Sequence, residues 1–144
     1  MKPQNYGNHV RMVPAFHYVA VPLSLIITVA SIVYLLVSGK SGLSLFGSLL
    51  FVSFSILAFM NLLFVRRFAC KVQDRAIRAE ESLRYFALAG KRLDSRLTME
   101  QIIALRFASD EEYVALSEKA ANEGTPPVDL KRIIRTWRAD HERV

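Results

Sequence analysis

The chain has 144 residues, of which 52% are hydrophobic, and it carries a formal net charge of +6 at pH 7. All 13 acidic residues and 16 of the 19 lysines and arginines lie in residues 66–144, which therefore carry only +3, too balanced a charge to indicate a nucleic-acid binder. One cysteine, Cys70, excludes an intramolecular disulfide framework and fits a reducing compartment.

Two long uncharged apolar runs occupy the first half of the chain, Tyr18–Val37 and Leu43–Val65. Each is long enough to cross a bilayer as a helix, which takes about 20 residues. The first run exceeds the apolar core of a signal peptide, and no A-x-A-like cleavage site precedes the second, so we expect it to be retained. The sequence therefore predicts a transmembrane helical hairpin over residues 18–65, with spans 18–37 and 43–65 and a tip at 38–42.

The basic residues predict the orientation of this hairpin. Lys2 and Arg11 precede the first span, whereas the short tip offers only Lys40. By the positive-inside rule both termini are cytoplasmic and the tip faces out, which makes 1–17 a cytoplasmic segment and 66–144 a cytoplasmic helical module. The basic cluster after the second span also supplies candidate contacts with anionic headgroups. These candidate membrane-surface residues are Arg66, Arg67, Lys71 and Arg75.

Four serines are candidates for packing between the spans. An antiparallel hairpin brings Ser31 near Ser48 and Ser24 near Ser55. Small residues let helix backbones approach, and hydroxyls bond across such an interface. The alternative, given equal weight, is that each hydroxyl bonds a carbonyl of its own helix.

Two further residues mark an irregularity in the hairpin. Pro22 leaves the carbonyl of Tyr18 without its helical donor, so we expect a kink or a neighbouring donor there. Asn61 lies opposite approximately Val19 and is the candidate donor. Its position near the cytoplasmic boundary favours this structural role over a role in transport.

The second span is expected to continue as a helix into the cytoplasm. Val72, Ala76, Ala79, Leu83, Phe86 and Gly90 recur at spacings of four and three, which predicts an apolar stripe that packs against another helix. Packing within a small bundle and a dimeric coiled coil both remain open. The pairs Asp74 with Arg78 and Glu80 with Arg84 have the spacing of helix-stabilising ion pairs.

Three more helices are predicted in the tail. Thr98 with Gln101 and Ser109 with Glu112 form capping boxes, the second helix ends before Gly124, and Pro126-Pro127 opens the last. The predicted fold is all-α, a transmembrane hairpin whose second span continues into a small cytoplasmic bundle. One face of the last helix is apolar through Leu130, Ile133, Ile134 and Trp137; the other is basic through Lys131, Arg132, Arg135 and Arg138.

The last helix has two functional interpretations besides a structural one. Trp137 and the four basic residues Lys131, Arg132, Arg135 and Arg138 are of the types enriched at interface hot spots, and they form the candidate partner-docking site. A basic helix after a short turn also suggests a DNA reader, but the acidic residues of the preceding helix oppose nucleic acid. The structural alternative places Trp137 in the core.

Catalysis is not indicated. His9, His17 and His141 do not have the spacing of a ligand set, and H-E-x-x-H, C-x-x-C and G-x-S-x-G patterns do not occur. We therefore expect a protein that is not an enzyme, with no catalytic residues, no metal site and no cofactor.

Segments along nearly the whole chain resemble a family of small bacterial two-span membrane proteins without an assigned activity. These segments are Gln4–Tyr6, Asn8–His9, Leu93–Thr98, Ile102–Glu112 and Trp137–His141. The resemblance implies a protein of the bacterial inner membrane. The expected function is a non-catalytic accessory or scaffolding subunit, whose partners are the lipid bilayer and other membrane subunits or a second copy. The alternative is a membrane-tethered regulator whose C-terminal helix binds nucleic acid or a soluble signalling partner.

Overall fold

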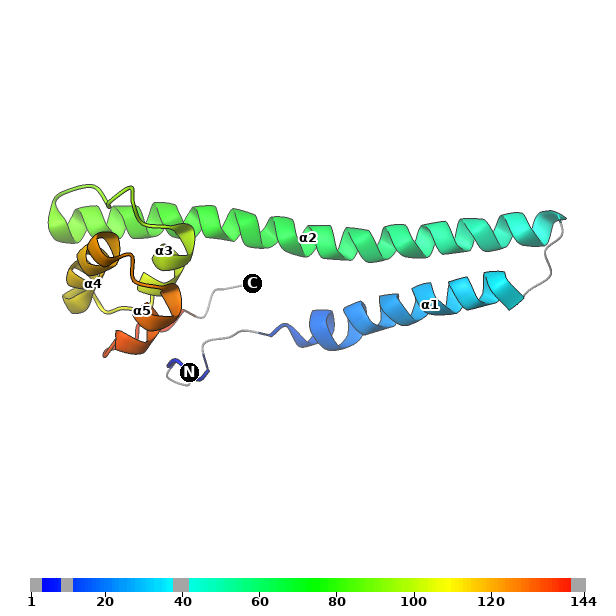
Figure 1. The fold of residues 1–144 in the computed structure, drawn as a ribbon, viewed down its shortest axis with the longest axis horizontal. Helices are drawn as coiled ribbons and strands as arrows, with labels where there is room; N and C mark the ends of the chain where they lie inside the picture. The colour runs from blue at the N-terminus through cyan, green and yellow to red at the C-terminus, as the bar shows by residue number, and fades with distance from the viewer. Residues whose placement is uncertain (1–3, 9–11, 38–41, 141–144) are drawn as a thin grey trace. The chain divides into compact units, whose positions relative to one another are not determined.

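The computed structural model describes residues 4–8, 12–37 and 42–140. Residues 38–41 of the predicted tip 38–42, together with Lys2 and Arg11, lie outside the described residues, and Gly42 begins α2. Every regular element within the described ranges is a helix, which confirms the all-α prediction (Figure 1). The elements in chain order are η1 (Ala15–Ala20), α1 (Val21–Val37), α2 (Gly42–Ala89), α3 (Met99–Leu105), α4 (Asp110–Glu123) and α5 (Pro127–Ile133).

The chain divides into two compact units. The apolar unit is Met12–Ala69, and the C-terminal unit combines Met1–Arg11 with Cys70–Val144. The unbroken α2 contributes to both, which confirms the prediction that the second apolar run continues as one helix. With 48 residues and a rise of about 1.5 Å per residue, α2 is about 72 Å long. That length exceeds what a bilayer core of about 30 Å requires.

The irregularity expected at Pro22 takes the form of a π-helical turn. η1 immediately precedes α1, and the N–H of Val21 donates to the carbonyl of Phe16 five residues back. Proline supplies no N–H, so widening the preceding turn redistributes the hydrogen bonds that an α-helix would leave unmade. Pro14 lies at the start of η1, and the Val13 carbonyl lies 2.9 Å from Nδ1 of His17.

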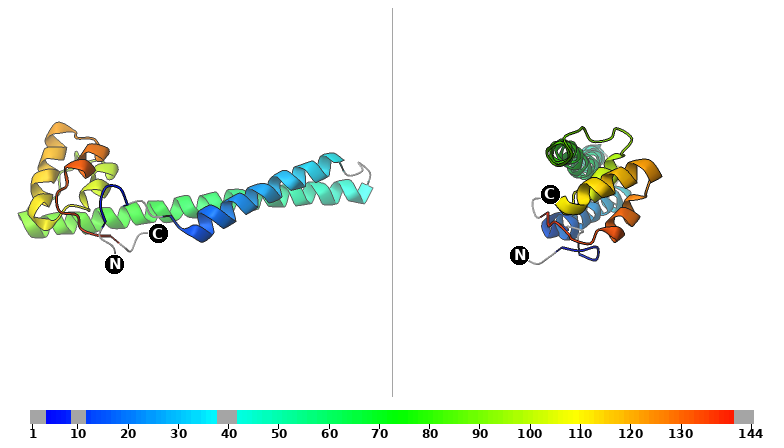
Figure 2. Two further views of the ribbon diagram at one scale, coloured as in Figure 1. Left: turned by 90° about the horizontal axis from the view of Figure 1, so that it is seen from below. Right: turned by 90° about the vertical axis from the view of Figure 1, so that its left-hand side faces the viewer.

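The core of the C-terminal unit forms where α3, α4 and α5 pack beside the last part of α2 (Figure 2). Phe107, Tyr113 and Leu130 are fully buried there, together with Leu105. From α2, Ile77 and Tyr85 join this cluster, although α2 is otherwise exposed over most of its surface. The tail is therefore anchored on one face of the long helix.

The apolar stripe of α2 is not the face that packs on the tail. Val72, Leu83 and Phe86 are exposed, and Ile77, Glu81 and Tyr85 on the opposite side are buried. Of the two alternatives for the stripe, packing within the chain's own bundle is therefore not the one found. Hydrophobic periodicity missed the packing face because two of its members, Glu81 and Arg84, are charged residues that pair with each other.

The predicted helix ends are confirmed at three of four positions. The Thr98 hydroxyl accepts from the Gln101 N–H, and the Gln101 side chain accepts from the Thr98 N–H. Gly124 ends α4 with a φ of 64°, a left-handed conformation that glycine adopts without strain. Pro127 occupies the first turn of α5. At the fourth position Ser109 precedes α4 as predicted, but its side chain makes no capping bond.

The last helix is shorter than predicted, ending at Ile133 instead of continuing past Trp137. The chain then runs extended beside residues 107–109, where the N–H of Arg138 donates to the Phe107 carbonyl at 2.7 Å. The Glu112 carboxylate accepts from the N–H groups of Arg135 and Thr136, so it serves this segment rather than a capping box. Backbone groups freed at the helix end thus obtain partners elsewhere.

The N-terminal segment lies against the C-terminal extended segment. The Gln4 amide donates to the Asp140 carbonyl at 3.1 Å and accepts from the Asp140 N–H at 2.8 Å. Asp140 in turn forms an ion pair with buried Arg106 at 3.1 Å, and the Arg132 guanidinium lies 5.7 Å from the centre of the Tyr6 ring. The segment Met1–Arg11 therefore belongs to the same unit as the tail.

Candidate functional site

Among the described residues, two helices are long and apolar enough to cross a membrane. They are Ala15–Val37 and Ser44–Ala89, with mean hydropathies of 2.4 and 2.3 over their most apolar stretches. Only 6% and 11% of these stretches are buried within the protein. A helix of a soluble core would be mostly covered by its own chain, so uncovered apolar side chains of this number fit association with lipid.

A pair of serines joins the two apolar helices. The hydroxyls of Ser31 on α1 and Ser55 on α2 lie 3.0 Å apart, and both residues are buried. The Thr28 hydroxyl also reaches the Ser55 carbonyl at 3.4 Å. The structure thus joins Ser31 to Ser55, where the sequence paired Ser31 with Ser48 and Ser24 with Ser55. Thr28 was missed because it pairs with a backbone carbonyl, not with a side chain.

The serine hydroxyls also bond within their own helices. Ser24 donates to the Val21 carbonyl at 2.9 Å, and buried Ser48 donates to the Ser44 carbonyl at 2.8 Å. Contacts between the helices and bonds to carbonyls of the same helix, the two alternatives for the serines, therefore both occur. Asn61 is exposed on α2, and its role as the donor that compensates Pro22 stays a prediction.

The candidate membrane-surface residues follow the apolar part of α2. The Arg66 guanidinium lies 5.6 Å from the centre of the Phe16 ring, within cation–π range. Arg67, Lys71 and Arg75 are exposed. Their role as contacts with anionic headgroups stays a prediction, with which their exposure is compatible.

The candidate docking residues do not share one helical face. Trp137 is half-buried against Phe107, with ring centres 5.0 Å apart, which favours the structural interpretation of this residue. Lys131 and Arg132 lie on α5, and Arg132 is 3.4 Å from Asp129 of the same helix. The other two basic residues, Arg135 and Arg138, are exposed on the extended segment. The continuous basic helix of the DNA-reader hypothesis is therefore not formed.

A charged network centred on Arg84, which sequence patterns did not reveal, joins α2 to the start of α4 and to the segment before it. Arg84 donates to the carboxylates of Glu81 at 3.1 Å and Asp110 at 2.7 Å, and to the Ala108 carbonyl at 2.7 Å. Its guanidinium also lies 4.2 Å from the centre of the Tyr113 ring. Arg84 is thus paired with Glu81 and Asp110 rather than with Glu80, as the helical spacing predicted.

Tyr113 has a raised pKa because it is buried beside the Glu81 carboxylate. Its hydroxyl donates to the Glu81 carbonyl at 3.1 Å. In the unfolded chain the phenol titrates near pH 10, so the unfolded state loses this proton first as the pH rises. The contribution of Tyr113 to stability is therefore complete below about pH 10 and declines above it.

We expect Tyr113→Phe to lower the free energy of unfolding by about 1 kcal/mol at pH 7, because the hydrogen bond is lost. The variant should also lose less stability than the parent between about pH 9 and pH 11. Thermal unfolding of the full chain in detergent micelles across this range measures both effects. Equal losses of stability in variant and parent above pH 10 would contradict this assignment.

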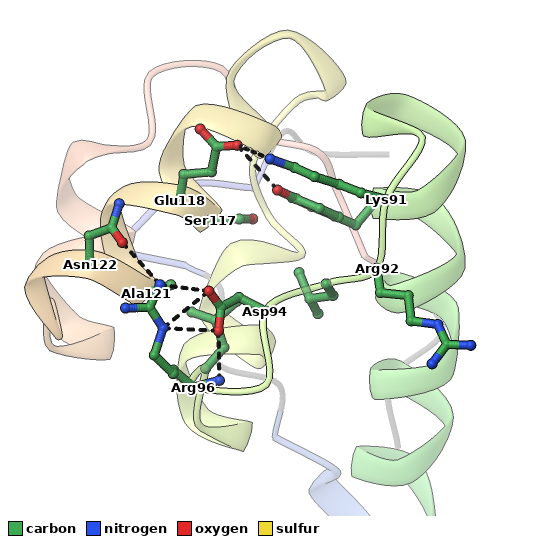
Figure 3. Close-up of a pocket in the computed structure, with 11 residues that line it drawn as sticks. Lys91, Arg92, Asp94, Arg96, Ser117, Glu118, Ala121 and Asn122 are labelled. Carbon is green, nitrogen blue, oxygen red and sulfur yellow. Dashed lines mark hydrogen bonds and ion pairs between the residues drawn. The ribbon is translucent and has the colours of Figure 1, made fainter.

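A cavity of about 260 Å³ opens between the end of α2 and α4 (Figure 3). Arg96 there contacts the Asp94 carboxylate at 2.7 Å and the Asn122 side-chain oxygen at 3.0 Å. Lys91 contacts Glu118 at 2.8 Å. Hydrogen bonds from Arg96 lower the pKa of Asp94 to about 2, and Lys91 lowers that of Glu118. The four charged groups therefore form two ion pairs within the lining of the cavity.

The fifth charged residue that lines this cavity, Arg92, points away from the two ion pairs (Figure 3). Within the described ranges no group of three or more His, Cys, Asp or Glu residues has a geometry that could hold a metal ion. Cys70 is half-buried and forms no disulfide. The surface that stands out is thus the uncovered apolar area on α1 and α2.

Comparison with known proteins places the chain in a family. No curated protein and no solved structure matches it. The model of one family, described as a family of unknown function (DUF6526), matches residues 1–144, the whole sequence printed above. Since the match extends over both the apolar unit and the C-terminal unit, the chain belongs to the DUF6526 family.

Proposed function

We propose that this protein is a non-catalytic scaffolding subunit that holds a small helical module at the cytoplasmic face of the bacterial inner membrane. In this proposal α1 and the first part of α2 form a two-span hairpin, with both termini in the cytoplasm. The observation that carries the proposal is α2 itself. One unbroken helix bears exposed apolar side chains in its first part and a folded unit on its last part.

The contacts of the N-terminal segment support this topology. Gln4 and Tyr6 lie against Asp140 and Arg132 in one unit, which supports placing both ends of the chain on the same side of the membrane. An even number of spans between them agrees with this placement. The basic residues from Arg66 to Arg78 indicate that this side is the cytoplasm.

The interior of the C-terminal unit supports a role in holding rather than in reacting. Its buried charges are committed to structure, since Arg84 pairs with Glu81 and Asp110, and Arg106 pairs with Asp140. In contrast, the unit leaves an apolar face of α2 uncovered, which is a property of surfaces that bind other proteins.

Purification of the tagged full chain from its native membrane in a mild detergent tests the proposal. We expect stoichiometric recovery of at least one other integral membrane protein. A matched variant with Lys131, Arg132, Arg135 and Arg138 changed to Glu should retain that partner, because the hairpin and α2 are unchanged. Recovery of the chain without any other protein would contradict the scaffolding role. Salt-sensitive recovery of nucleic acid that disappears in the variant would favour the regulator instead.

A further inference from the structure

The uncovered face of α2 has the spacing of a coiled-coil seam. Val72, Ala76, Ala79, Leu83 and Phe86 follow one another at intervals of four, three, four and three, the heptad pattern of alternating a and d positions. Val72 is 68% exposed, Leu83 69% and Phe86 55%, and both alanines are exposed. We call these five residues the α2 seam.

We infer that the α2 seam binds the α2 seam of a second copy of this chain as a parallel two-helix coiled coil. The inference rests on the proposed membrane anchoring, because copies inserted with the same topology present α2 in the same direction. Ala76 and Leu83 then occupy a positions, and Val72, Ala79 and Phe86 occupy d positions, so each residue faces its own equivalent in the other copy.

Charge complementarity favours a second copy as the occupant. In this register Arg75 is at a g position and Glu80 at the following e position, five residues apart. A parallel coiled coil places each g residue beside the next e residue of the other helix, so Arg75 pairs with Glu80 of the second copy. The two-fold axis creates this ion pair twice. Both residues are exposed, and Arg84 is already held by Glu81 and Asp110, which leaves Glu80 available.

The other flanking residues are compatible with this register. Ser82 and Ala87 at the next g and e positions are uncharged and introduce no repulsion. The alanines at 76 and 79 let the two helix backbones approach closely. Two heptads form a short coiled coil, but confinement of both copies to one membrane raises their effective concentration, so little intrinsic affinity is needed.

Disulfide crosslinking in native membranes tests the seam. In a Cys70→Ser background, Ala79→Cys places a thiol at a d position that faces its own equivalent, and an oxidant should convert the chain to covalent dimer. Ala115→Cys is the matched control, because Ala115 is exposed on α4 away from the seam. We expect at least tenfold more dimer from Ala79→Cys. Equal yields from the two variants, or no dimer from Ala79→Cys, would overturn the inference.

A charge exchange tests the parallel register. In the Ala79→Cys background, Arg75→Glu should reduce the dimer yield several-fold, because it places a second carboxylate beside Glu80 of the other copy. Adding Glu80→Arg should restore the yield. Arg78→Glu, an equal charge change outside the seam, should leave it unchanged. Failure of the exchange to restore crosslinking would overturn the proposed pairing.

A carbonate wash of the same membranes separates the two proposals. If the protein stays in the membrane after the wash but the Ala79→Cys variant does not crosslink, only the proposed pairing of the two seams is overturned. Chain that is released by the wash overturns the membrane anchoring on which the parallel direction rests.

Discussion

Replacing Arg84 by methionine should destabilise the C-terminal unit by about 3–5 kcal/mol, the cost typical of breaking a buried ion pair by removing one partner. Glu81 is buried, and its carboxylate would lose the guanidinium that now lies 3.1 Å away. The Ala108 carbonyl would also lose its donor at 2.7 Å. Urea unfolding of the full chain in micelles, followed by the fluorescence of Trp137, the chain's single tryptophan, measures the change.

Two further variants identify the cause of this loss. Arg92→Met removes an exposed arginine just beyond the end of α2 and should change stability by less than about 0.5 kcal/mol. The double variant Arg84→Met/Glu81→Gln should recover much of the lost stability, because no uncompensated charge remains buried. The network would have a minor role if Arg84→Met cost less than about 1 kcal/mol. It would act through packing alone if the double variant were no more stable.

Leu57→Arg should shift the membrane insertion of the second span by about 3 kcal/mol, or roughly 100-fold, toward the non-inserted state. Leu57 lies near the middle of the predicted span 43–65 and is 64% exposed on α2. In water an arginine at an exposed helix position is nearly neutral, so the size of the effect reports the surroundings of Leu57. Cell-free translation with membrane vesicles measures the inserted fraction.

Leu88→Arg is the matched control for this variant. Leu88 is also exposed on α2, but it lies 31 residues further along, beyond any span of ordinary length. Its replacement should leave insertion unchanged. If the two arginine variants insert to the same extent, the first part of α2 does not cross the membrane.

Patterns with a local physical cause were predictable from the sequence. A capping box needs only residues three apart, as at Thr98 and Gln101, and a helix-ending glycine such as Gly124 acts through its own φ. The continuity of α2 was predictable because neither proline nor a cluster of turn residues interrupts the sequence from Gly42 to Ala89. These features do not depend on residues distant in the chain.

Features that depend on distant residues were not predictable. α5 ends at Ile133 because backbone N–H groups of the following segment donate to the Phe107 carbonyl and the Glu112 carboxylate. Helical periodicity carries no information about such long-range hydrogen bonds. Hydrophobic periodicity likewise did not identify the face of α2 that packs on the tail, because that face contains the paired charged residues Glu81 and Arg84. The partner of Ser31 depended on the register between two helices, which sequence separation alone does not determine.

In the proposed function, the α2 seam and the two apolar helices are the surfaces through which the protein acts. The apolar stretches of α1 and α2 are mostly exposed, and the residues of the α2 seam, on the part of the helix that holds the tail, are exposed as well. A scaffold needs such surfaces, since its binding energy comes from apolar area removed from water or lipid contact on assembly.

Thiol labelling in intact cells tests the membrane anchoring most directly. A membrane-impermeant maleimide should label a Lys40→Cys variant in a Cys70→Ser background without permeabilisation, because the tip faces out. In the parent chain the same reagent should reach native Cys70, which is half-buried at the start of the C-terminal unit, only after permeabilisation. Labelling of Cys70 in intact cells, with Lys40→Cys protected, would contradict the proposed cytoplasmic location of the helical module.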